Sequence, residues 1–581
     1  MKSRWILIFI LGLSSFATAQ NYQLKWGEDL RLKKGTTDLS IIAADRTGLY
    51  FTEERKPGGN TDPSGEPATH SLYKLDNNLG EVFSKMYKKE LKGLDFQSFQ
   101  MLGKQLFLFA TDYDKRTRSF KIFGAKLNMD NGDLSGDFDE LGSYELENKQ
   151  DNYEMKITAV RNGTSFLMVS NISAPDRVSL GVCLLDKQLK KIKNTVINLA
   201  FEPNLYYIQD VWYSQNDKII LLGKLFEETP VGKKKRTRLV FKEYVMAVYN
   251  TDGVKEKGIP LNAADKYIIN GKLIEQPSGD LLLAGFYSNT SKKDELSGFF
   301  INKVNTGQGE LVLSSYKEIN GAMLGKSYEE AGDEDDETKE NKQQADKAKD
   351  AGDADELPNS FVIRSVDVNP LDNSIIITGE VAQYSRYSYY QQNYNYNTRT
   401  YTRTRKDIYS FRNQDVLLIH ADMSGNIRWL NVLPKSQLEE IRTTTTDFAT
   451  GYSYFYDRYF YDRGEYFALS GGVPFYSSFK SFIYNNTLVL IMNDHSSNNV
   501  NPAYGDKVRT VFNFNKKSNL VAVSVDLATG KMNRKIIASN NDETILMPRL
   551  GFVYENELII PSWRQHLMAK TELKFAKITV R

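Results

Sequence analysis

Histidine most often supplies acid–base and metal chemistry near neutral pH, and it is scarce in this 581-residue sequence. The four histidines are His70, His420, His495 and His566. His420 sits in the apolar stretch LLIHAD, which is typical of a buried strand. The other three would suit a metal ion only if the fold joined their segments. We therefore assign no metal site and no catalytic residue, and we expect no cofactor.

Two stretches rich in tyrosine and arginine are the strongest candidates for a binding surface. YSRYSYYQQNYNYNTRTYTRTR runs from Tyr384 to Arg405, and YSYFYDRYFYDRGEYF runs from Tyr452 to Phe467. Tyrosine and arginine are enriched at protein interfaces, and tyrosine rings also stack on sugars. The alternative is a low-complexity segment that is disordered or packs on itself. The predicted contact residues are Tyr387, Tyr389, Tyr394, Tyr396, Arg399, Arg403, Tyr454, Arg458, Tyr459 and Arg463.

The first twenty residues resemble a secretory signal. Lys2 and Arg4 precede an apolar run, and Ala17-Thr18-Ala19 supplies a small-x-small cleavage pattern. We expect cleavage near Ala19 and a protein that is periplasmic, secreted or at the cell surface, with no transmembrane segment.

Overall charge gives no reason to expect nucleic acid as a partner. Removing Lys2 and Arg4 from the 75 basic residues leaves the chain formally neutral against its 73 acidic residues. The single cysteine, Cys183, lies in the apolar stretch GVCLLD and is expected to be a buried free thiol. The acidic segment 327–360 is expected to be a flexible insertion.

A repeat of alternating strands and turns runs through the chain. One half is an apolar strand, a turn and a second apolar strand, as in IIAADRTGLYFTE from Ile41 and SFIYNNTLVLIM from Ser481. The other half is a strand ending in Asp or Asn, a turn and one more strand, as in LYKLDNNLGEVF from Leu72. The halves alternate to give eight four-stranded units, the last of which lacks its fourth strand.

These units predict an all-β fold, a single β-propeller of eight blades. NYQLKWGEDL, which begins at Asn21, would supply the missing strand and close the ring. A seven-bladed or split propeller and another all-β fold remain alternatives. We expect residues 1–19 to be the signal peptide and residues 20–581 to be the propeller domain, with Tyr/Arg-rich insertions at 384–412 and 445–477.

The stretches VAVSVDLATGKMNR from Val521 and LLIHADMSGNIRW from Leu417 resemble the repeat of quinoprotein-type (PQQ-like) propellers. That resemblance implies either a quinone-dependent dehydrogenase or a catalytically inert scaffold. The dehydrogenases commonly use an adjacent cysteine pair, which a chain with one cysteine lacks, so the scaffold branch is favoured. The composition is also similar to that of secreted proteins of Bacteroidota.

The long insertions all fall between the second and third strands of a unit or between units, which places them on one face of the disc. We therefore expect a non-enzymatic binding or scaffold protein of the bacterial cell envelope. Its partner would be a protein, such as an outer-membrane or secretion complex, held by the Tyr/Arg-rich insertions. The alternative is a carbohydrate-binding or carbohydrate-active propeller with a site over the central channel.

Overall fold

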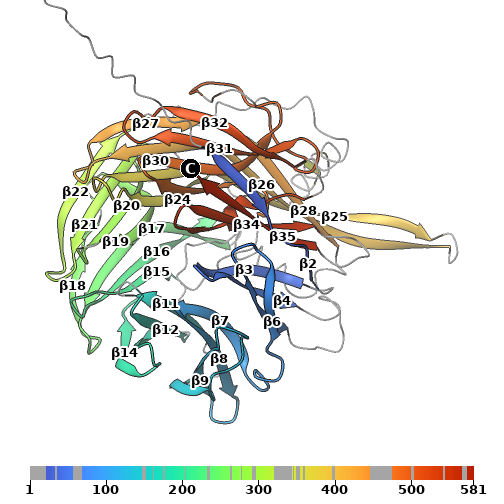
Figure 1. The fold of residues 1–581 in the computed structure, drawn as a ribbon. Coiled ribbons are helices and arrows are strands. Elements are labelled where there is room, and N and C mark those ends of the chain that lie inside the picture. The colour runs from blue at the N-terminus through green and yellow to red at the C-terminus, as the bar shows by residue number, and fades with distance from the viewer. Residues whose placement is uncertain are drawn as a thin grey trace, which may run out of the picture.

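Eight antiparallel sheets form a closed ring in the computed structural model, as Figure 1 shows. The structure describes residues 21–581 except 33–35, 56–67, 147–151, 161–162, 175–176, 203–204, 232–235, 262, 264, 277, 291–295, 320–342, 344–345, 348–353, 357–359, 396–398, 445–473, 499–500, 502, 541–543 and 565–571. The expected all-β fold and the eight-bladed propeller are confirmed. None of the helices within these described ranges is long and apolar enough to cross a membrane.

The first four blades follow the chain without interruption. Their strands, from the axis outward, are β3 (Thr36–Asp45), β4 (Gly48–Arg55), β5 (Thr69–Leu75) and β6 (Glu81–Met86) in blade one; β7 (Asp95–Leu102), β8 (Gln105–Asp114), β9 (Ser119–Lys126) and β10 (Asp139–Glu145) in blade two; β11 (Asn152–Val160), β12 (Ser165–Ser173), β13 (Val178–Leu185) and β14 (Lys191–Leu199) in blade three; and β15 (Tyr206–Tyr213), β16 (Ile219–Val231), β17 (Arg236–Tyr249) and β18 (Lys255–Ile259) in blade four.

The remaining blades include the longest strands. They are β19 (Tyr267–Glu275), β20 (Leu281–Ser288), β21 (Gly298–Asn305) and β22 (Glu310–Glu318) in blade five; β24 (Ser360–Val368), β25 (Ile375–Asn395), β26 (Thr400–Ala421) and β27 (Ile427–Leu433) in blade six, with β23 (Ala354–Glu356) and β28 (Gln437–Thr444) added at its edges; β29 (Phe479–Tyr484), β30 (Thr487–His495), β31 (Ser518–Asp526) and β32 (Met532–Ser539) in blade seven; and β33 (Phe552–Tyr554), β34 (Glu557–Arg564), β35 (Glu572–Val580) and β1 (Tyr22–Trp26) in blade eight. The short strand β2 (Leu30–Arg31) also pairs with β35, and the 3₁₀ turn η3 (Pro548–Leu550) precedes β33.

The N-terminal strand closes the ring, as the sequence predicted. β1 pairs antiparallel with β35, from Tyr22 opposite Val580 to Trp26 opposite Ala576. Both ends of the described chain therefore belong to blade eight, and β35 has a hydrogen-bonded neighbour on each side. A closed ring of this kind leaves only short, protected sheet edges.

The Asp or Asn that ends the third strand of a blade builds the following turn. Asp76 and Asp186 each accept two backbone N–H groups through one carboxylate oxygen, at 2.7 to 3.0 Å. The turn needs one residue with positive φ, which is Leu79 in blade one, Leu189 in blade three and Gly425 in blade six. The recurring Asp/Asn-turn pattern in the sequence thus has a direct structural cause.

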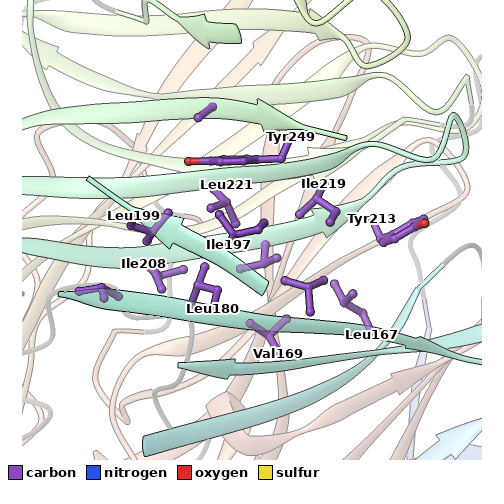
Figure 2. Close-up of a cluster of buried hydrophobic side chains, with 14 of the residues drawn as sticks. Leu167, Val169, Leu180, Ile197, Leu199, Ile208, Tyr213, Ile219, Leu221 and Tyr249 are labelled. Atoms are coloured by element: carbon purple, nitrogen blue, oxygen red, sulfur yellow. The ribbon is translucent and has the colours of Figure 1, made fainter. Parts of the chain in front are cut away.

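Apolar side chains are buried between neighbouring blades rather than in one central core. Figure 2 shows the layer between blades three and four, where Leu167 and Leu180 face Ile219, Leu221 and Tyr249. Burying each such aliphatic side chain stabilises the fold by about 1.5 to 3 kcal/mol. Cys183 is buried in the layer between blades two and three, as predicted, and burial raises the pKa of its thiol to about 11.

The first strands of the blades surround the axis. β7 approaches β11, β19 approaches β24 and β3 approaches β33, so the first strands of successive blades are neighbours. Five of these eight strands carry a β-bulge within the ladder to the second strand, in blades one, two, four, five and six. A bulge turns local side chains away from the regular alternation and is common next to functional sites.

Candidate functional site

The Tyr384–Arg405 stretch forms a regular β-hairpin that projects from blade six. β25 and β26 continue their pairing outward from Ala382 opposite Asn413 to Asn395 opposite Thr400. Figure 1 shows this ribbon extending well beyond the disc. We call residues 382–413 the arm. The predicted position between the second and third strands is confirmed, but the segment is a hairpin rather than a loop, because its Tyr and Thr residues favour strand and alternate with polar residues.

Two added strands widen the base of the arm. β23 pairs with β25 between Ser385 and Tyr387, and β28 pairs with β26 between Lys406 and Asn413. The base is therefore four-stranded and the outer part is a two-stranded ribbon. An isolated two-stranded ribbon is marginally stable in water, so the added strands provide the support that the arm needs.

The pairing register sorts the residues of the arm onto two faces, because directly opposite residues in an antiparallel pair share a face. Tyr390 lies opposite Arg405, and Tyr394 lies opposite Tyr401. One face, which we call the Tyr/Arg face, is formed by positions Tyr384, Arg386, Ser388, Tyr390, Gln392, Tyr394, Tyr401, Arg403, Arg405, Asp407, Tyr409 and Phe411. The other face holds Thr400, Thr402 and Thr404 opposite Gln and Asn positions.

Aromatic rings anchor the base of the Tyr/Arg face. Tyr384, Tyr409 and Phe411 are each at most 5% exposed, and the rings of Tyr384 and Phe411 lie 4.8 Å apart. The guanidinium of Arg386 lies over the ring of Tyr409 at 5.4 Å, a cation–π contact. Farther out, Tyr390 is 51% and Tyr401 is 72% exposed. The aromatic stripe is thus buried near the disc and presented to solvent away from it.

The predicted contact residues occupy different places. Tyr387 is buried at the base against Ile408, and Tyr389 is half-buried beside it. Arg399 is exposed at the turn of the arm, where its φ of 53° is left-handed. Tyr394 and Arg403 lie in the outer strands, both on the Tyr/Arg face.

Five other predicted positions lie outside the described residues: Tyr396, Tyr454, Arg458, Tyr459 and Arg463. The same holds for the signal peptide, for most of the acidic insertion 327–360 and for most of the 445–477 insertion. Their predicted roles stay predictions.

A buried ion cluster holds the arm to the disc. Glu380, in β25 just before the arm, accepts hydrogen bonds from Lys435 Nζ at 2.5 Å and from Ser478 Oγ at 2.8 Å, and Arg364 forms an ion pair with it. Glu380 and Lys435 are completely buried. Burial alone would raise the pKa of Glu380, but the charges of Arg364 and Lys435 and these hydrogen bonds keep it below its ordinary value.

Neighbouring amides complete this cluster. Gln437 Oε1 accepts from Lys435 Nζ at 2.8 Å and from the backbone N–H of Ser478 at 2.7 Å. Asn413 accepts from Arg364 and donates to Ser477 Oγ at 2.9 Å. We call Arg364, Glu380, Asn413, Lys435, Gln437 and Ser478 the root cluster. It joins strands β24, β25, β26 and β28 of blade six to the start of blade seven.

A second buried carboxylate, that of Glu439, binds the chain at residues 475–477. Glu439, in β28, accepts the backbone N–H groups of Phe475, Tyr476 and Ser477 at 2.7 to 2.8 Å. Burial raises the pKa of Glu439 although these three hydrogen bonds oppose the shift. The base of the arm is thus tied to residues 475–477 as well as to its own sheet.

A ring of charged residues lies on the first strands of blades three to seven. Their signs alternate around the axis, and we call them the channel ring: Lys156, Asp210, Lys272, Asp367 and Lys480. Lys272 is exposed and the other four are half-buried. The charge of a lysine from the blade on either side acts to lower the pKa of each aspartate.

The channel ring has perturbed acid–base properties. Burial raises the pKa of Asp210 to about 7, while the charges of Lys156 and Lys272 act in the opposite direction. Burial also raises the pKa of Asp367, and it lowers the pKa of Lys480. Half-buried carboxyl groups with raised pKa values are candidates for functional groups.

The histidines do not form a metal site in the described part of the chain. His420 is buried, as predicted, and its Nε2 lies 2.6 Å from Ser374 Oγ. His70 stacks on Phe96, and His495 Nδ1 accepts the backbone N–H of Ser497. His566 lies outside the described residues. Among the residues that are described, no three His, Cys, Asp or Glu side chains gather as metal ligands.

A cleft of about 510 Å³ lies between blades one and eight. It is lined by the turns between paired strands, including Asp45, Asp76 and Glu555. Those turns are at the end of the disc opposite the arm, so the cleft and the arm do not form one surface.

Comparison with known proteins assigns no family to the chain. No family model matches the chain, and no curated protein matches it. Solved structures that resemble it include the β-propeller domain of the Trilobed protease from Pyrococcus furiosus, with 9% identity, a TM-score of 0.30 and coverage of 67% of this chain and 98% of that one. Another is an α-L-arabinanase from Penicillium chrysogenum, with 9% identity, a TM-score of 0.28 and coverage of 61% and 94%.

A third is prolyl oligopeptidase B from Galerina marginata, with 12% identity and a TM-score of 0.27. That match covers 60% of this chain and spans only 39% of the length of the oligopeptidase. Likeness at these levels carries no conclusion about this chain.

Sequence reasoning found the arm but missed the root cluster and the channel ring. The signal for the ring was a charged residue among the apolar residues of a first strand, as in YYIQDVWY around Asp210 and SFVIRSVDV around Asp367. The signal for the root cluster was weaker, because Glu380 and Lys435 are fifty-five positions apart. Glu380 is on β25 and Lys435 lies between β27 and β28, which both pair with β26, so the sheet of blade six brings them together.

Proposed function

We propose that this protein is a non-enzymatic binding or scaffold protein of the bacterial cell envelope that holds a protein partner with its arm. The observation that carries the proposal is the arm itself, a long β-ribbon whose Tyr/Arg face continues beyond the disc. Large aromatic surfaces with polar tips and planar guanidinium groups are typical of the energetically dominant residues at protein interfaces.

The charge of the arm suggests the kind of surface it fits. Arg386, Arg399, Arg403, Arg405 and Lys406 outnumber the single acid, Asp407, over residues 384–411. A partner surface with negative charge and exposed apolar area would complement it. Because the chain without Lys2 and Arg4 is formally neutral as a whole, this attraction would be local to the arm.

The firmly held base of the arm is suited to holding a partner against mechanical load. A ribbon that must hold a partner has to transmit force to the body without bending at its base, and the root cluster and the added strands provide such a base. A flexible tether would need none of these buried groups.

The signal-like segment at residues 1–19 is the basis for proposing the cell envelope. Export would place the disc in the periplasm or outside the cell, where an outer-membrane or secretion complex is a suitable partner. The quinoprotein-type repeat pattern is in keeping with a scaffold of this class.

A second candidate function rests on the channel ring. A carbohydrate-binding or carbohydrate-active propeller would use Asp210 and Asp367, because carboxyl groups with raised pKa values are suited to acid catalysis and to hydrogen bonding with hydroxyl groups. The inner strands would then be the working part, and the arm would serve another purpose.

Shortening the arm tests the first proposal. Replacing residues 390–405 by Asn-Gly leaves Tyr389 opposite Lys406 as the last pair and closes the hairpin with a two-residue turn. Cross-linking in intact cells, followed by mass spectrometry, should recover an envelope protein with the wild type and lose it with this variant.

Blade four offers a matched control. Its β16–β17 hairpin also extends past its blade, and replacing residues 229–238 by Asn-Gly leaves Glu228 opposite Leu239 as the last pair. This variant should keep the partner. Equal recovery of the partner by both shortened proteins would contradict the proposal.

A further inference from the structure

The outer part of the arm leaves one side of β25 open. β25 pairs with β26 from Gln391 to Asn395, and no strand in the described part of the chain pairs with its other side over these residues. Closer to the disc, β23 occupies that side and reaches as far as Tyr387. The β25–β26 ladder has no bulge beyond Ala382, so the open side is a regular row of backbone N–H and C=O groups. We call residues 391–395 of β25 the open edge, and an edge of this kind is a template for pairing with another strand.

Charged residues protect the outer edges of the blades but not the open edge. Proteins prevent unwanted pairing at a sheet edge with charged side chains, proline or bulges. The outermost strand of every blade carries at least one lysine, arginine, aspartate or glutamate, in β6, β10, β14, β18, β22, β27, β32 and β1. Residues 387–398, by contrast, include no charged residue and no proline. The open edge therefore lacks these protections and is suited to being covered by another strand.

The two strands of the arm differ in charge, and this difference restricts what can cover the open edge. Arg403 and Arg405 lie in β26, opposite Gln392 and Tyr390. Pairing of β26 with β26 of a second copy would bring these arginines together, and like charges on facing strands are destabilising. The open edge can pair with its own copy without that repulsion, because its Gln, Asn and Tyr residues are uncharged. An acidic partner is attracted to the arginines instead, so charge favours a second copy of this chain at the open edge.

We propose that two copies of this protein form a dimer by pairing their open edges antiparallel about a twofold axis at Asn393. Gln391 of one copy lies opposite Asn395 of the other, and Gln392 lies opposite Tyr394. The added strand stops short of Tyr387, so β23 keeps its place in both copies. Because the paired strands run in opposite directions, the two discs lie at opposite ends of the joined ribbons. The arm extends well beyond the disc, which leaves room for this arrangement (Figure 1).

The assembly ends at two copies. The outer strands of the joined ribbon are β26 of each copy, and Arg403 and Arg405 in these strands oppose further pairing. Directly opposite residues in antiparallel strands share a face, so the two Tyr/Arg faces lie on the same side of the joined ribbon and form one surface. The dimer goes beyond the proposed function, because it forms without any protein partner.

Sedimentation equilibrium of the purified protein tests the dimer. Two short edges make a small interface, so we expect a dissociation constant of about 1 to 100 µM. Between about 1 µM and about 300 µM protein, the mass should therefore rise from that of one chain toward that of two. The mass of a single chain at every concentration would overturn the proposal, and so would a mass that grows beyond two chains.

One added charge on each strand of the arm gives a matched pair of variants. Asn393→Lys places two lysines opposite each other at the twofold axis and should weaken the dimer by about tenfold or more. Thr402→Lys places the same charge directly across the ladder, on the same face of the arm but on β26, and should leave the dimer unchanged. Equal dissociation constants for the two variants would put the contact elsewhere and overturn the proposal. Neither position is on the Tyr/Arg face, so both variants should still recover the envelope partner, and the dimer and the proposed function can fail separately.

A cysteine at the axis locates the contact directly. The single native cysteine, Cys183, is buried, so mild oxidation can join two chains only through a new thiol. Opposite residues of antiparallel strands are close enough for a disulfide, so Asn393→Cys should give a covalent dimer and Thr402→Cys should not. Equal cross-linking of both variants would overturn the proposal. The protein with the shortened arm lacks the open edge, and a dimer that survived in it would also overturn the proposal.

Discussion

The root cluster and the channel ring contain the same kinds of residue but differ in how far these are buried and in which groups bond to them. In the root cluster, Glu380, Lys435 and Gln437 are closed off from solvent and satisfy one another with protein hydrogen bonds. In the channel ring, Asp367 keeps an oxygen without a donor among the described residues, and Lys272 is exposed. A charged group whose partners come from the protein supports the fold, whereas one whose partners must come from outside is ready to bind.

Removing the central carboxylate of the root cluster should have the largest effect. Glu380→Ala leaves Lys435 buried without its ion pair, which typically costs about 3 to 5 kcal/mol of unfolding free energy. Guanidinium denaturation measures this loss. Glu256→Ala is the control, because its ion pair with Lys218 is partly exposed and breaking it costs at most about 1 kcal/mol. If Glu380→Ala lost no more unfolding free energy than the control, the root cluster would not be a main source of stability.

An intermediate, pH-dependent effect is expected in the channel ring. The pKa of Asp210 is raised to about 7 in the folded protein, so the folded state holds a proton that the unfolded chain releases above about pH 4. Stability from this group is therefore fully present below about pH 4 and is lost as the pH rises to about 7. Asp210→Asn abolishes this loss.

The unfolding free energies of the wild type and of Asp210→Asn should therefore diverge as the pH rises. Relative to the wild type, Asp210→Asn should gain about 2 kcal/mol of unfolding free energy between about pH 4 and pH 8, which is half the full linkage because the side chain is partly open. Denaturation curves measured across this range test the expectation. Parallel stability profiles would mean that Asp210 titrates in the folded protein as it does in the unfolded chain.

The smallest effect on stability is expected for the exposed lysine of the channel. Lys272→Met should change the unfolding free energy by less than about 1 kcal/mol, because exposed charges contribute little. It should raise the pKa of Asp210 further, since the positive charge of Lys272 favours the carboxylate. An NMR titration of the Asp210 carboxyl carbon measures that shift, and an unchanged pKa would show that the two groups do not interact.

The fold could be predicted from the sequence because its information is local. Asp76 and Asp186 mark the ends of strands through hydrogen bonds to residues two and four positions on, and such short-range patterns are visible in a single sequence. The closing strand was also found, since Trp26 lies in a segment that resembles the outer strand around Trp429. The residue range of the arm was found by composition.

The missed features depend on contacts across blades. Glu380 meets Lys435 only once the sheet of blade six has formed, and it meets Ser478 only where blade seven begins. Asp210 and Lys272 come together only where blades four and five adjoin. Nothing in the sequence indicated that the arm is widened by β23 and β28, because neither short strand has a strong apolar pattern. Long-range pairing, not residue type, makes these groups functional candidates.

The closure of blade eight has a consequence for the order in which the protein is made. Tyr22 leaves the ribosome among the earliest residues of the described chain, yet its strand partner, Val580, is synthesised only after the other seven blades. Those seven blades can form during translation, but the eighth must wait while β1 stays without its partner strand. A chain stalled late in synthesis would therefore expose both β1 and the flank of blade seven to other strands. A chaperone that shields newly made β-strands would be most needed during that interval.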